Sequence, residues 1–343
     1  KTRGNPWKLL LSLGLLTAFL SMILDNVTTI ILITPITIVI SRLIGISPLP
    51  LLMGEAILSN VGGAGTLVGD PPNIMIGSEA GFGFNTFLIY SFPVALVGLA
   101  AVLVLFKFLF KKDLSTEPKD ISRLMKMDPT EAIEDMRMLK QLLAVFAGVV
   151  ALFFVHSALH LEPSVVALLG AAVALLIIRA KEDPHEIIVK TELSVLLFFA
   201  SLFVIVGGME YAHVLEMIGN IITGTAESNL LLTAILVLWV SAILSAIVDN
   251  IPFTVAMIPI LAFLGTQGID VNLLWWALVF GVGFGGNGTP IGSSAGVIVM
   301  SKSEDTETPI TFKAWMKYGL PATIVSLIVA SGAITLMYYF ELV

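Results

Sequence analysis

Two Asp-Asn pairs interrupt apolar stretches of this sequence, and their side chains could bind a cation. Asp25 and Asn26 lie in the first apolar run, and Asp249 and Asn250 lie in the run 230–264. Carboxylate and amide oxygens are hard ligands, which suit sodium or a proton rather than a soft metal. An Asp-Asn pair is also an ordinary helix N-cap, but its recurrence in apolar surroundings favours binding. We therefore predict a sodium or proton site at these four residues.

Two further motifs are rich in glycine. The strings GGAGTLVGDPPN at 62–73 and GGNGTPIGSSAG at 285–296 share four glycines and a threonine. Threonine hydroxyls, and carbonyls that glycine leaves accessible, can bind a polar solute, although the glycines could instead serve only close helix packing. Over all these motifs, the predicted substrate-binding and ion-binding residues are Asp25, Asn26, Gly65, Thr66, Asp70, Asn73, Asp249, Asn250, Gly288, Thr289 and Ser293.

Four acidic residues fall within predicted membrane segments, whereas Lys and Arg lie near the segment ends. The four are Asp25, Glu55, Asp70 and Asp249. A carboxylate in a cavity inside the membrane can exchange a proton for another ion, which is the physical basis of an antiporter. These residues are the candidates for proton coupling, although Glu55 could equally be a packed structural acid. Glu55 and Asp70 have no acidic counterpart in the repeat described below, so a proton carried by either would break its symmetry.

Composition places the motifs in a membrane protein. Of 343 residues, 57% are hydrophobic and 13% are charged, against about 25% charged in a soluble domain. Apolar runs recur along the whole chain, so we predict an all-α polytopic membrane protein. The net charge of −7 argues against nucleic-acid binding, and the absence of cysteine excludes disulfides and thiolate metal sites. We expect neither enzymatic activity nor a cofactor.

An internal repeat relates the motifs to one another. Residues 21–36 align with 245–260 at an offset of 224, and six of the sixteen positions are identical. Residues 62–73 align with 285–296 at an offset of 223. Inverted repeats with interrupted helices are typical of secondary transporters, whose binding sites lie at the interruptions. We therefore predict two inverted-topology repeats, each with a re-entrant helical hairpin and a broken transmembrane helix.

The basic residues predict the orientation of the chain. Seven of the 18 Lys and Arg lie in 111–140, so the positive-inside rule makes this linker and the N-terminus cytoplasmic and the C-terminus external. Only the second repeat has segments ahead of its hairpin, so we expect N-terminal spans of the first repeat to be missing from this chain. The predicted parts are the transport part of repeat 1 at 1–110 (hairpin 7–42, broken helix 45–80, span 87–108), the linker 111–140, and repeat 2 at 141–343 (scaffold spans 141–209, hairpin 230–266, broken helix 272–301, span 320–340).

At these motifs the sequence resembles the ion transporter superfamily. That superfamily includes arsenite permeases of the ArsB type, NhaD-type sodium/proton antiporters, the melanosomal P protein, and the citrate and dicarboxylate (divalent anion:sodium) symporters. The strings GDPPN at 69–73, VDNIPF at 248–253 and GTPIGS at 288–293 are most similar to the arsenite permease and P-protein branch. The resemblance implies a scaffold and a transport part in each repeat, elevator-type movement and a homodimer. The dicarboxylate symporters carry Ser-Asn-Thr at the hairpin tips, where this chain has Asp-Asn-Val and Asp-Asn-Ile, and this departure favours proton-coupled exchange.

Together these observations predict a secondary active transporter. The leading hypothesis is a proton-coupled antiporter that exports arsenite, antimonite or a related small solute. The alternatives are a sodium/proton antiporter, a sodium-coupled anion symporter of the citrate or dicarboxylate type, a passive channel, and an intramembrane aspartyl protease that uses Asp25 and Asp249. The expected partners are the small ion or solute, protons or sodium, and the lipid bilayer, and the sequence leaves open whether an ATPase subunit associates. The expected location is the inner (plasma) membrane of a bacterium or archaeon.

Overall fold

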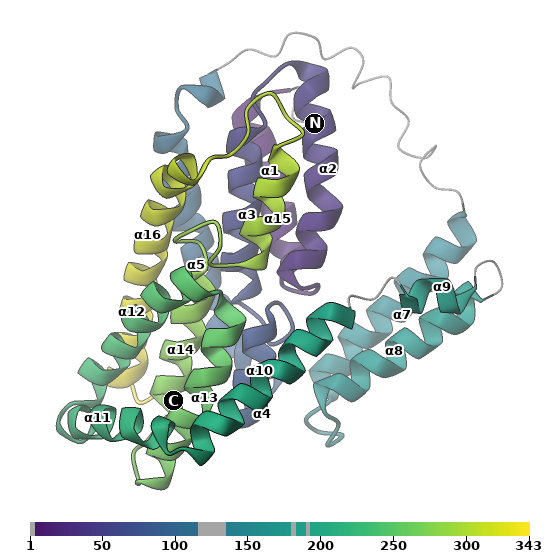
Figure 1. Cartoon of the computed structure of the whole chain (residues 1–343). Helices are drawn as coiled ribbons and strands as arrows, with labels where there is room; N and C mark the ends of the chain where they lie inside the picture. Colours follow the sequence, from purple (N-terminus) through teal and green to yellow (C-terminus); the bar gives the residue numbers. More distant parts are fainter. Residues whose placement is uncertain (1–3, 116–134, 180–182, 190–192) are drawn as a thin grey trace.

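The computed structural model describes residues 4–115, 135–179, 183–189 and 193–343, and all regular secondary structure within these ranges is helical (Figure 1). The composition predicts this all-α fold. The central part of the predicted linker, residues 116–134, lies outside the described ranges. The helices before it are α1 (Pro6–Ser21), α2 (Asn26–Ile44), α3 (Leu49–Gly63), α4 (Pro71–Ala80), α5 (Phe84–Leu109) and the short 3-10 helix η1 (Asp113–Ser115).

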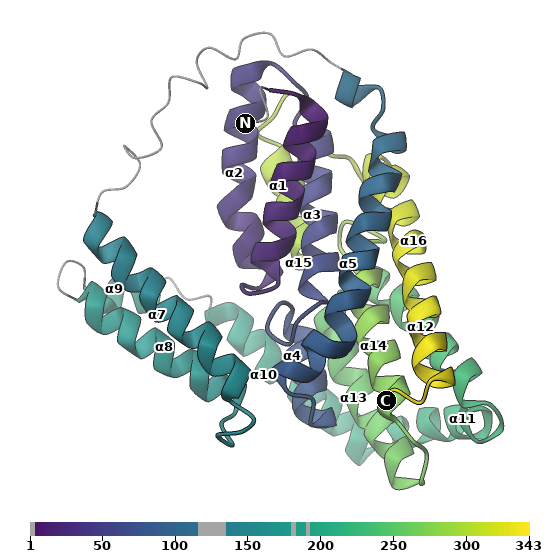
Figure 2. The same ribbon diagram turned by 180° about the vertical axis from the view of Figure 1, so that it is seen from behind.

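The helices after the linker form two groups. Helices α7 and α8 pack against each other, and together with α9 they lie to one side of the main group of helices in both views (Figures 1 and 2). A hydrogen bond of 3.2 Å from the Phe84 backbone N–H to His156 Nε2 joins the end of α7 to the start of α5. The helices are α7 (Met136–Val155), α8 (Pro163–Ile178), α9 (Pro184–Val189), α10 (Leu193–Tyr211), α11 (Val214–Ser228), α12 (Leu230–Val248), α13 (Asn250–Thr266), α14 (Asn272–Gly285), α15 (Ser294–Ser303) and α16 (Phe312–Tyr339).

Helices α3 and α14 form the centre of the molecule. Apart from its first residue, each of the two helices is buried throughout, as expected for helices that are largely apolar on all sides. Close contacts with α1 and α12 require glycine. A Cβ on Gly62 would lie 2.5 Å from the Ala18 carbonyl oxygen, and one on Gly285 would lie 2.6 Å from the Ala242 carbonyl oxygen.

Five helices have the length and composition to cross a bilayer. A crossing needs about 20 mostly apolar residues. Large apolar side chains such as Ile89, Val104 and Ile328 are exposed on their outer faces, as contact with lipid requires. The chain is thus a polytopic membrane protein by the length and composition of its helices. The five are α2, α5, α7, α12 and α16.

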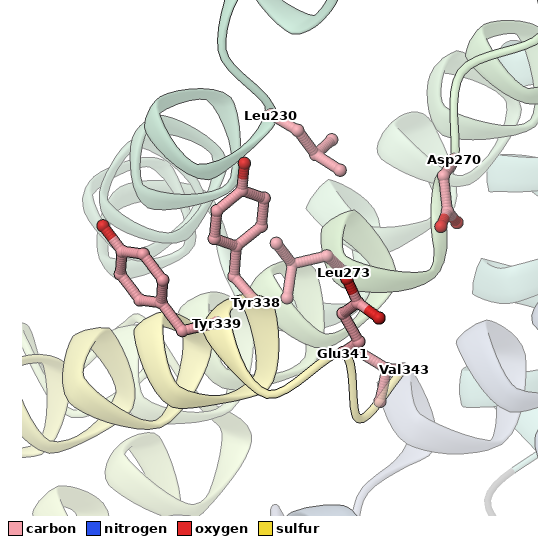
Figure 3. A pocket seen from close by; sticks show the side chains of 7 residues that line it. All are labelled: Leu230, Asp270, Leu273, Tyr338, Tyr339, Glu341 and Val343. Atoms are coloured by element: carbon pink, nitrogen blue, oxygen red, sulfur yellow. The ribbon is translucent and has the colours of Figure 1, made fainter.

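A pocket lies at each end of the helices. At one end, the α2–α3 turn and residues 304–308 line a pocket of about 830 Å³, which contains Arg42 together with Glu304, Asp305 and Glu307. At the other end, the first turns of α12 and α14 and the loop before α14 meet the C-terminus around a pocket of about 510 Å³ (Figure 3). The second pocket contains two acidic residues and no basic one among the described residues. Its lining residues are Leu230, Asp270, Leu273, Tyr338, Tyr339, Glu341 and Val343.

The predicted hairpins and broken helices correspond to interrupted helix pairs. Residues 22–25 separate α1 from α2, and Asp249 alone separates α12 from α13. These four helices contain 16, 19, 19 and 17 residues, which is about 24 to 28 Å of helix at ~1.5 Å per residue. Residues 64–70 separate α3 from α4, and residues 286–293 separate α14 from α15. All four interruptions lie at the polar motifs of the sequence.

Candidate functional site

The acidic residue of each Asp-Asn pair caps the helix that follows it. Asp25 accepts hydrogen bonds from the backbone N–H groups of Val27 and Thr28, at 3.1 Å and 3.3 Å. Asp249 accepts one from the Ile251 N–H at 3.1 Å. Asp249 also adopts φ +86°, a conformation that costs a non-glycine residue about 1–3 kcal/mol and that clusters at functional sites. Both aspartates are therefore helix N-caps, as the N-cap interpretation of the sequence predicts. Their carboxylates lie at the helix interruptions.

The two broken helices restart at polar N-caps. Asp70 precedes α4, and Ser293 precedes α15 and accepts a hydrogen bond from the Gly296 N–H at 3.3 Å. The Asn73 amide donates to the carbonyl oxygens of Gly63 and Thr66, at 3.1 Å and 2.8 Å. The Asn73 amide nitrogen thus stabilises the break between α3 and α4, because it donates hydrogen bonds to carbonyl oxygens that have no partner within a helix.

The two threonines make equivalent contacts. The Thr66 hydroxyl donates to the Met22 carbonyl oxygen, and the Thr289 hydroxyl donates to the Ala246 carbonyl oxygen. Met22 and Ala246 are themselves 224 positions apart, which is the offset of the hairpin motifs. Each threonine therefore ties a broken helix to the first helix of its own hairpin. Because both hydroxyls are already used, a purely structural role accounts for both threonines.

The two predicted glycines lie at the same interruptions and are closely packed. A Cβ on Gly65 would lie 3.0 Å from the Ala95 Cβ, and one on Gly288 would lie 2.9 Å from the Ala246 Cβ. This crowding is what the close-packing interpretation of the glycines predicts. Neither glycine faces open space.

A buried chain of amides connects the first hairpin with the second broken helix. The Asn26 amide donates to Asn60 Oδ1 at 3.1 Å. The Asn60 amide in turn donates to Asn287 Oδ1 at 2.9 Å and to Ser293 Oγ at 2.8 Å. All four residues are at most 3% exposed. The cluster therefore brings together two predicted residues, Asn26 and Ser293, that are far apart in the sequence.

The second hairpin makes the corresponding contact with the first broken helix. The Asn250 amide donates to both carboxylate oxygens of Asp70, at 3.3 Å and 3.2 Å. Asp25 and Asp249 both lie close enough to Asp70 to interact with it electrostatically. Ser294 donates to Asp249 at 3.4 Å. Three of the four predicted proton-coupling acids thus share one region.

The predicted sodium ligands do not form one compact cluster. Asn26 contacts Asn60, whereas Asn250 contacts Asp70. The asparagines of the two Asp-Asn pairs therefore bond to different residues. Among the described residues, no group of three or more His, Cys, Asp or Glu side chains is close enough to hold a metal ion. In both contacts the amide nitrogen is the donor. The amide oxygens of Asn26 and Asn250 take no part in these two contacts.

Glu55 lies apart from this region. It is fully buried in α3 and accepts a hydrogen bond from the Thr37 hydroxyl of α2. Its other carboxylate oxygen has no hydrogen-bond partner among the described residues. The acid is therefore neither solvated nor fully paired.

Sequence reasoning missed Asn60 and Asn287. Both are fully buried and occupy the centre of the amide cluster. A signal for each was present, since Asn60 is an amide in an otherwise apolar helix and Asn287 interrupts the glycines of its motif. Neither has an asparagine at the aligned position, which is why the repeat did not reveal them.

The long apolar helices define an integral membrane protein as the class of this protein. Comparison with known proteins gives the family. The citrate transporter family model matches residues 1–281, so the chain belongs to the citrate transporter family.

Three relatives illustrate the similarity. The chain is 38% identical over 341 residues to the 46 kDa membrane protein of Mycobacterium leprae, covering 98% of this chain and 79% of that protein. It is also 38% identical over 344 residues to a protein of Mycobacterium tuberculosis described as an uncharacterized transporter, covering 99% and 79%. The human P protein is 32% identical over 404 residues, covering 95% of this chain and 48% of the P protein. The resemblance to the ion transporter superfamily and its P-protein branch is thereby confirmed.

Proposed function

We propose that this protein is a secondary active transporter whose binding site lies between the two hairpin tips and the two helix breaks. The observation that carries the proposal is the crossed pairing of the tips. Asn250 of the second hairpin contacts Asp70, the N-cap of α4, and Asn26 of the first hairpin reaches Ser293, the N-cap of α15, through Asn60. Movement of either tip would alter a site that both repeats build.

The matched contacts support two inverted repeats with re-entrant hairpins. Thr66 and Thr289 make equivalent hydrogen bonds, and Gly62 and Gly285 make equivalent close contacts. The two residues of each pair are aligned in the internal repeat of the sequence. Helices α2 and α3 meet at the Gly45–Pro48 turn, and Asn26 at the other end of α2 contacts Asn60 near the end of α3. The first hairpin therefore extends only as far as the break, whereas α4 continues for ten residues beyond it.

The charges at the site favour a cation or a neutral solute over a free anion. The N-termini of α2, α4, α13 and α15 offer partial positive charge, but an aspartate occupies the N-cap position of three of them. The basic residues of α1–α4 and α12–α15 are Lys8, Arg42 and Lys302, and each lies at the helix end far from the breaks. Our proposal is therefore proton-coupled antiport of arsenite, antimonite or a similar neutral solute, with Asp25, Asp70 and Asp249 carrying the proton.

Sodium/proton antiport is the second candidate, and the same three carboxylates favour it. Citrate is the substrate in the family's name, and its multiple negative charges would need neutralisation before it could enter this site.

In all cases we propose elevator-type movement, a homodimer, and a plasma-membrane location with the basic end of the helices in the cytoplasm. The positions of Lys8, Arg42 and Lys302 at that end of their helices support this orientation.

The experiment is ion flux in proteoliposomes that contain the purified full chain. We expect an imposed pH gradient to drive uphill movement of arsenite or, in the second candidate, of sodium. Asp249→Asn is expected to abolish the coupling without unfolding the protein, because asparagine still caps α13. Glu79→Gln, an exposed acid of α4, serves as the matched control. Coupled transport that is unchanged in Asp249→Asn would refute the assigned role, and downhill flux without coupling would indicate a channel.

A further inference from the structure

Helix α2 of the first hairpin contains a buried polar stripe, and the last three positions of this stripe are apolar or glycine in α13 of the second hairpin. On α2, the residues Asn26, Thr29, Thr34, Thr37 and Ser41 are all buried. Their spacing of three to five residues places them along one side of the helix. The stripe begins at the amide cluster and ends at Ser41, which lines the pocket of about 830 Å³ at the basic end of the helices. It therefore connects the site to the surface.

Glu55 lies beside the middle of this stripe. The Ser41 hydroxyl donates to the Thr37 carbonyl oxygen at 2.7 Å, and the Thr37 hydroxyl donates to Glu55 Oε1. Thr34 lies near the same carboxylate without reaching hydrogen-bonding geometry. One turn further along α3, the Ser59 hydroxyl donates to the Ser21 hydroxyl at 3.1 Å. Polar groups thus continue from the pocket, through Glu55, to the helix break.

Three buried oxygen atoms along the stripe have no hydrogen-bond partner among the described residues. They are Thr29 Oγ1, Thr34 Oγ1 and Glu55 Oε2. Leaving a buried polar atom unpaired costs about 1–3 kcal/mol. A bound proton or a water molecule at Glu55 Oε2 would satisfy that oxygen, and the unpaired oxygen distinguishes Glu55 from an ordinary packed acid, whose oxygens are all paired.

No other acidic group lies on the helices packed around Glu55. Helix α3 contacts α1, α2, α5, α14, α15 and α16, and these helices contain no Asp, Glu or His. Their basic residues lie in the terminal turns at the end of the molecule that bears the 830 Å³ pocket, and Glu55 forms no ion pair with them in the described structure. These residues are Lys8, Arg42, Lys107, Lys302, Lys313 and Lys317.

We infer that Glu55 is a separate proton-binding station, reached from the pocket at Arg42 along the hydroxyls of α2 and connected to the amide cluster on its other side. This inference rests on the proposed function for its role in transport. The step itself is the formation and loss of one O–H bond at Glu55 Oε2. The proton comes from water in the pocket and leaves toward the carboxylates at the helix breaks.

Infrared difference spectroscopy tests this station directly, because it needs no transported substrate. The purified full chain in lipid is titrated with acid and base, and the carbonyl band of a protonated carboxylic acid is followed. We expect wild type to show a band that appears and disappears with pH, and Glu55→Gln to lack it. Glu79→Gln, at an exposed acid of α4, is the control and should keep the band.

A second variant keeps the test valid where Glu55→Gln does not fold. Thr37→Val keeps the shape of the side chain and removes the hydrogen bond to Glu55, so the band should persist with a shifted frequency. Two results would overturn the inference: acid bands in Glu55→Gln identical to those of wild type, or a Glu55 band that does not respond to pH.

Flux measurements separate this inference from the proposed function. The same proteins in proteoliposomes are given a pH gradient with sodium chloride or sodium arsenite as the probe. If Glu55→Gln loses the infrared band but wild type moves neither probe uphill, the proposed function fails and the proton station stands. If wild type shows coupled flux and Glu55→Gln shows the same coupling, the station plays no part in transport and the inference fails.

Discussion

The two central helices, α3 and α14, occupy equivalent places but have different interiors. Each contacts the first helix of a hairpin through a glycine, and each ends at a break that a threonine ties to that hairpin. Yet α3 contains Glu55, Ser59 and Asn60, where α14 has Leu278, Val282 and Gly283. The backbone contacts thus follow the repeat, and the buried polar groups do not.

The hairpin helices differ in the same way. The buried hydroxyl residues of α2 align with apolar residues or glycine in α13: Thr34 with Ile258, Thr37 with Leu261 and Ser41 with Gly265. Burying a hydroxyl costs free energy unless the hydroxyl forms a hydrogen bond to the protein, to water or to a ligand. The comparison indicates that the two halves share their backbone contacts, whereas the buried hydroxyls at Thr34, Thr37 and Ser41 of α2 have no counterpart on α13.

The largest expected effect concerns the shared backbone contacts. Gly62→Ala and Gly285→Ala should each destabilise the protein by about 3 kcal/mol, because the new methyl group would meet backbone atoms of α1 or α12 that cannot move aside. The measurement is the thermal unfolding midpoint in detergent. Gly148→Ala is the control, since its Cβ would meet nothing within 4 Å, and it should leave the midpoint unchanged or raise it. A large loss at only one of the two positions would contradict the equivalence of the repeats.

An intermediate effect is expected at the centre of the amide cluster. Asn60→Ala would remove the three buried hydrogen bonds that join Asn60 to Asn26, Asn287 and Ser293, at a cost of about 2 kcal/mol. Asn85→Ala is the control, because it removes an exposed hydrogen bond to the Phe154 carbonyl oxygen. Unfolding curves that overlay wild type for Asn60→Ala would show that the cluster does not hold the first hairpin to the second broken helix.

The smallest effect tests the matched threonines. Thr66→Val and Thr289→Val each lose one hydrogen bond to a hairpin carbonyl and should each cost about 1 kcal/mol. The unfolding midpoint measures both losses, and coupled flux should remain, because both hydroxyls already donate to hairpin carbonyls. If Thr289→Val abolishes transport at unchanged stability, the hydroxyl binds substrate as the sequence suggested.

Much of the architecture followed from local sequence. Apolar runs, the positions of glycine and proline, and the Asp-Asn pairs predicted an all-α membrane protein with four interruptions, and the helices end at those motifs. Helix ends are predictable because capping depends on neighbouring residues. The internal alignment also paired Thr66 with Thr289, whose contacts are equivalent.

The partners of the site residues were decided only by the tertiary structure. Nothing near Asn60 in the sequence indicates that it bonds to Asn287, 227 positions away, or that Asn250 selects Asp70 rather than its neighbour Asp249. Such pairings depend on how closely α3, α14 and the hairpins approach, and that distance is set by packing around glycines over the whole core. Sequence thus determined which groups are polar and where helices break, whereas packing decided which of those groups meet and which hydroxyls are already used.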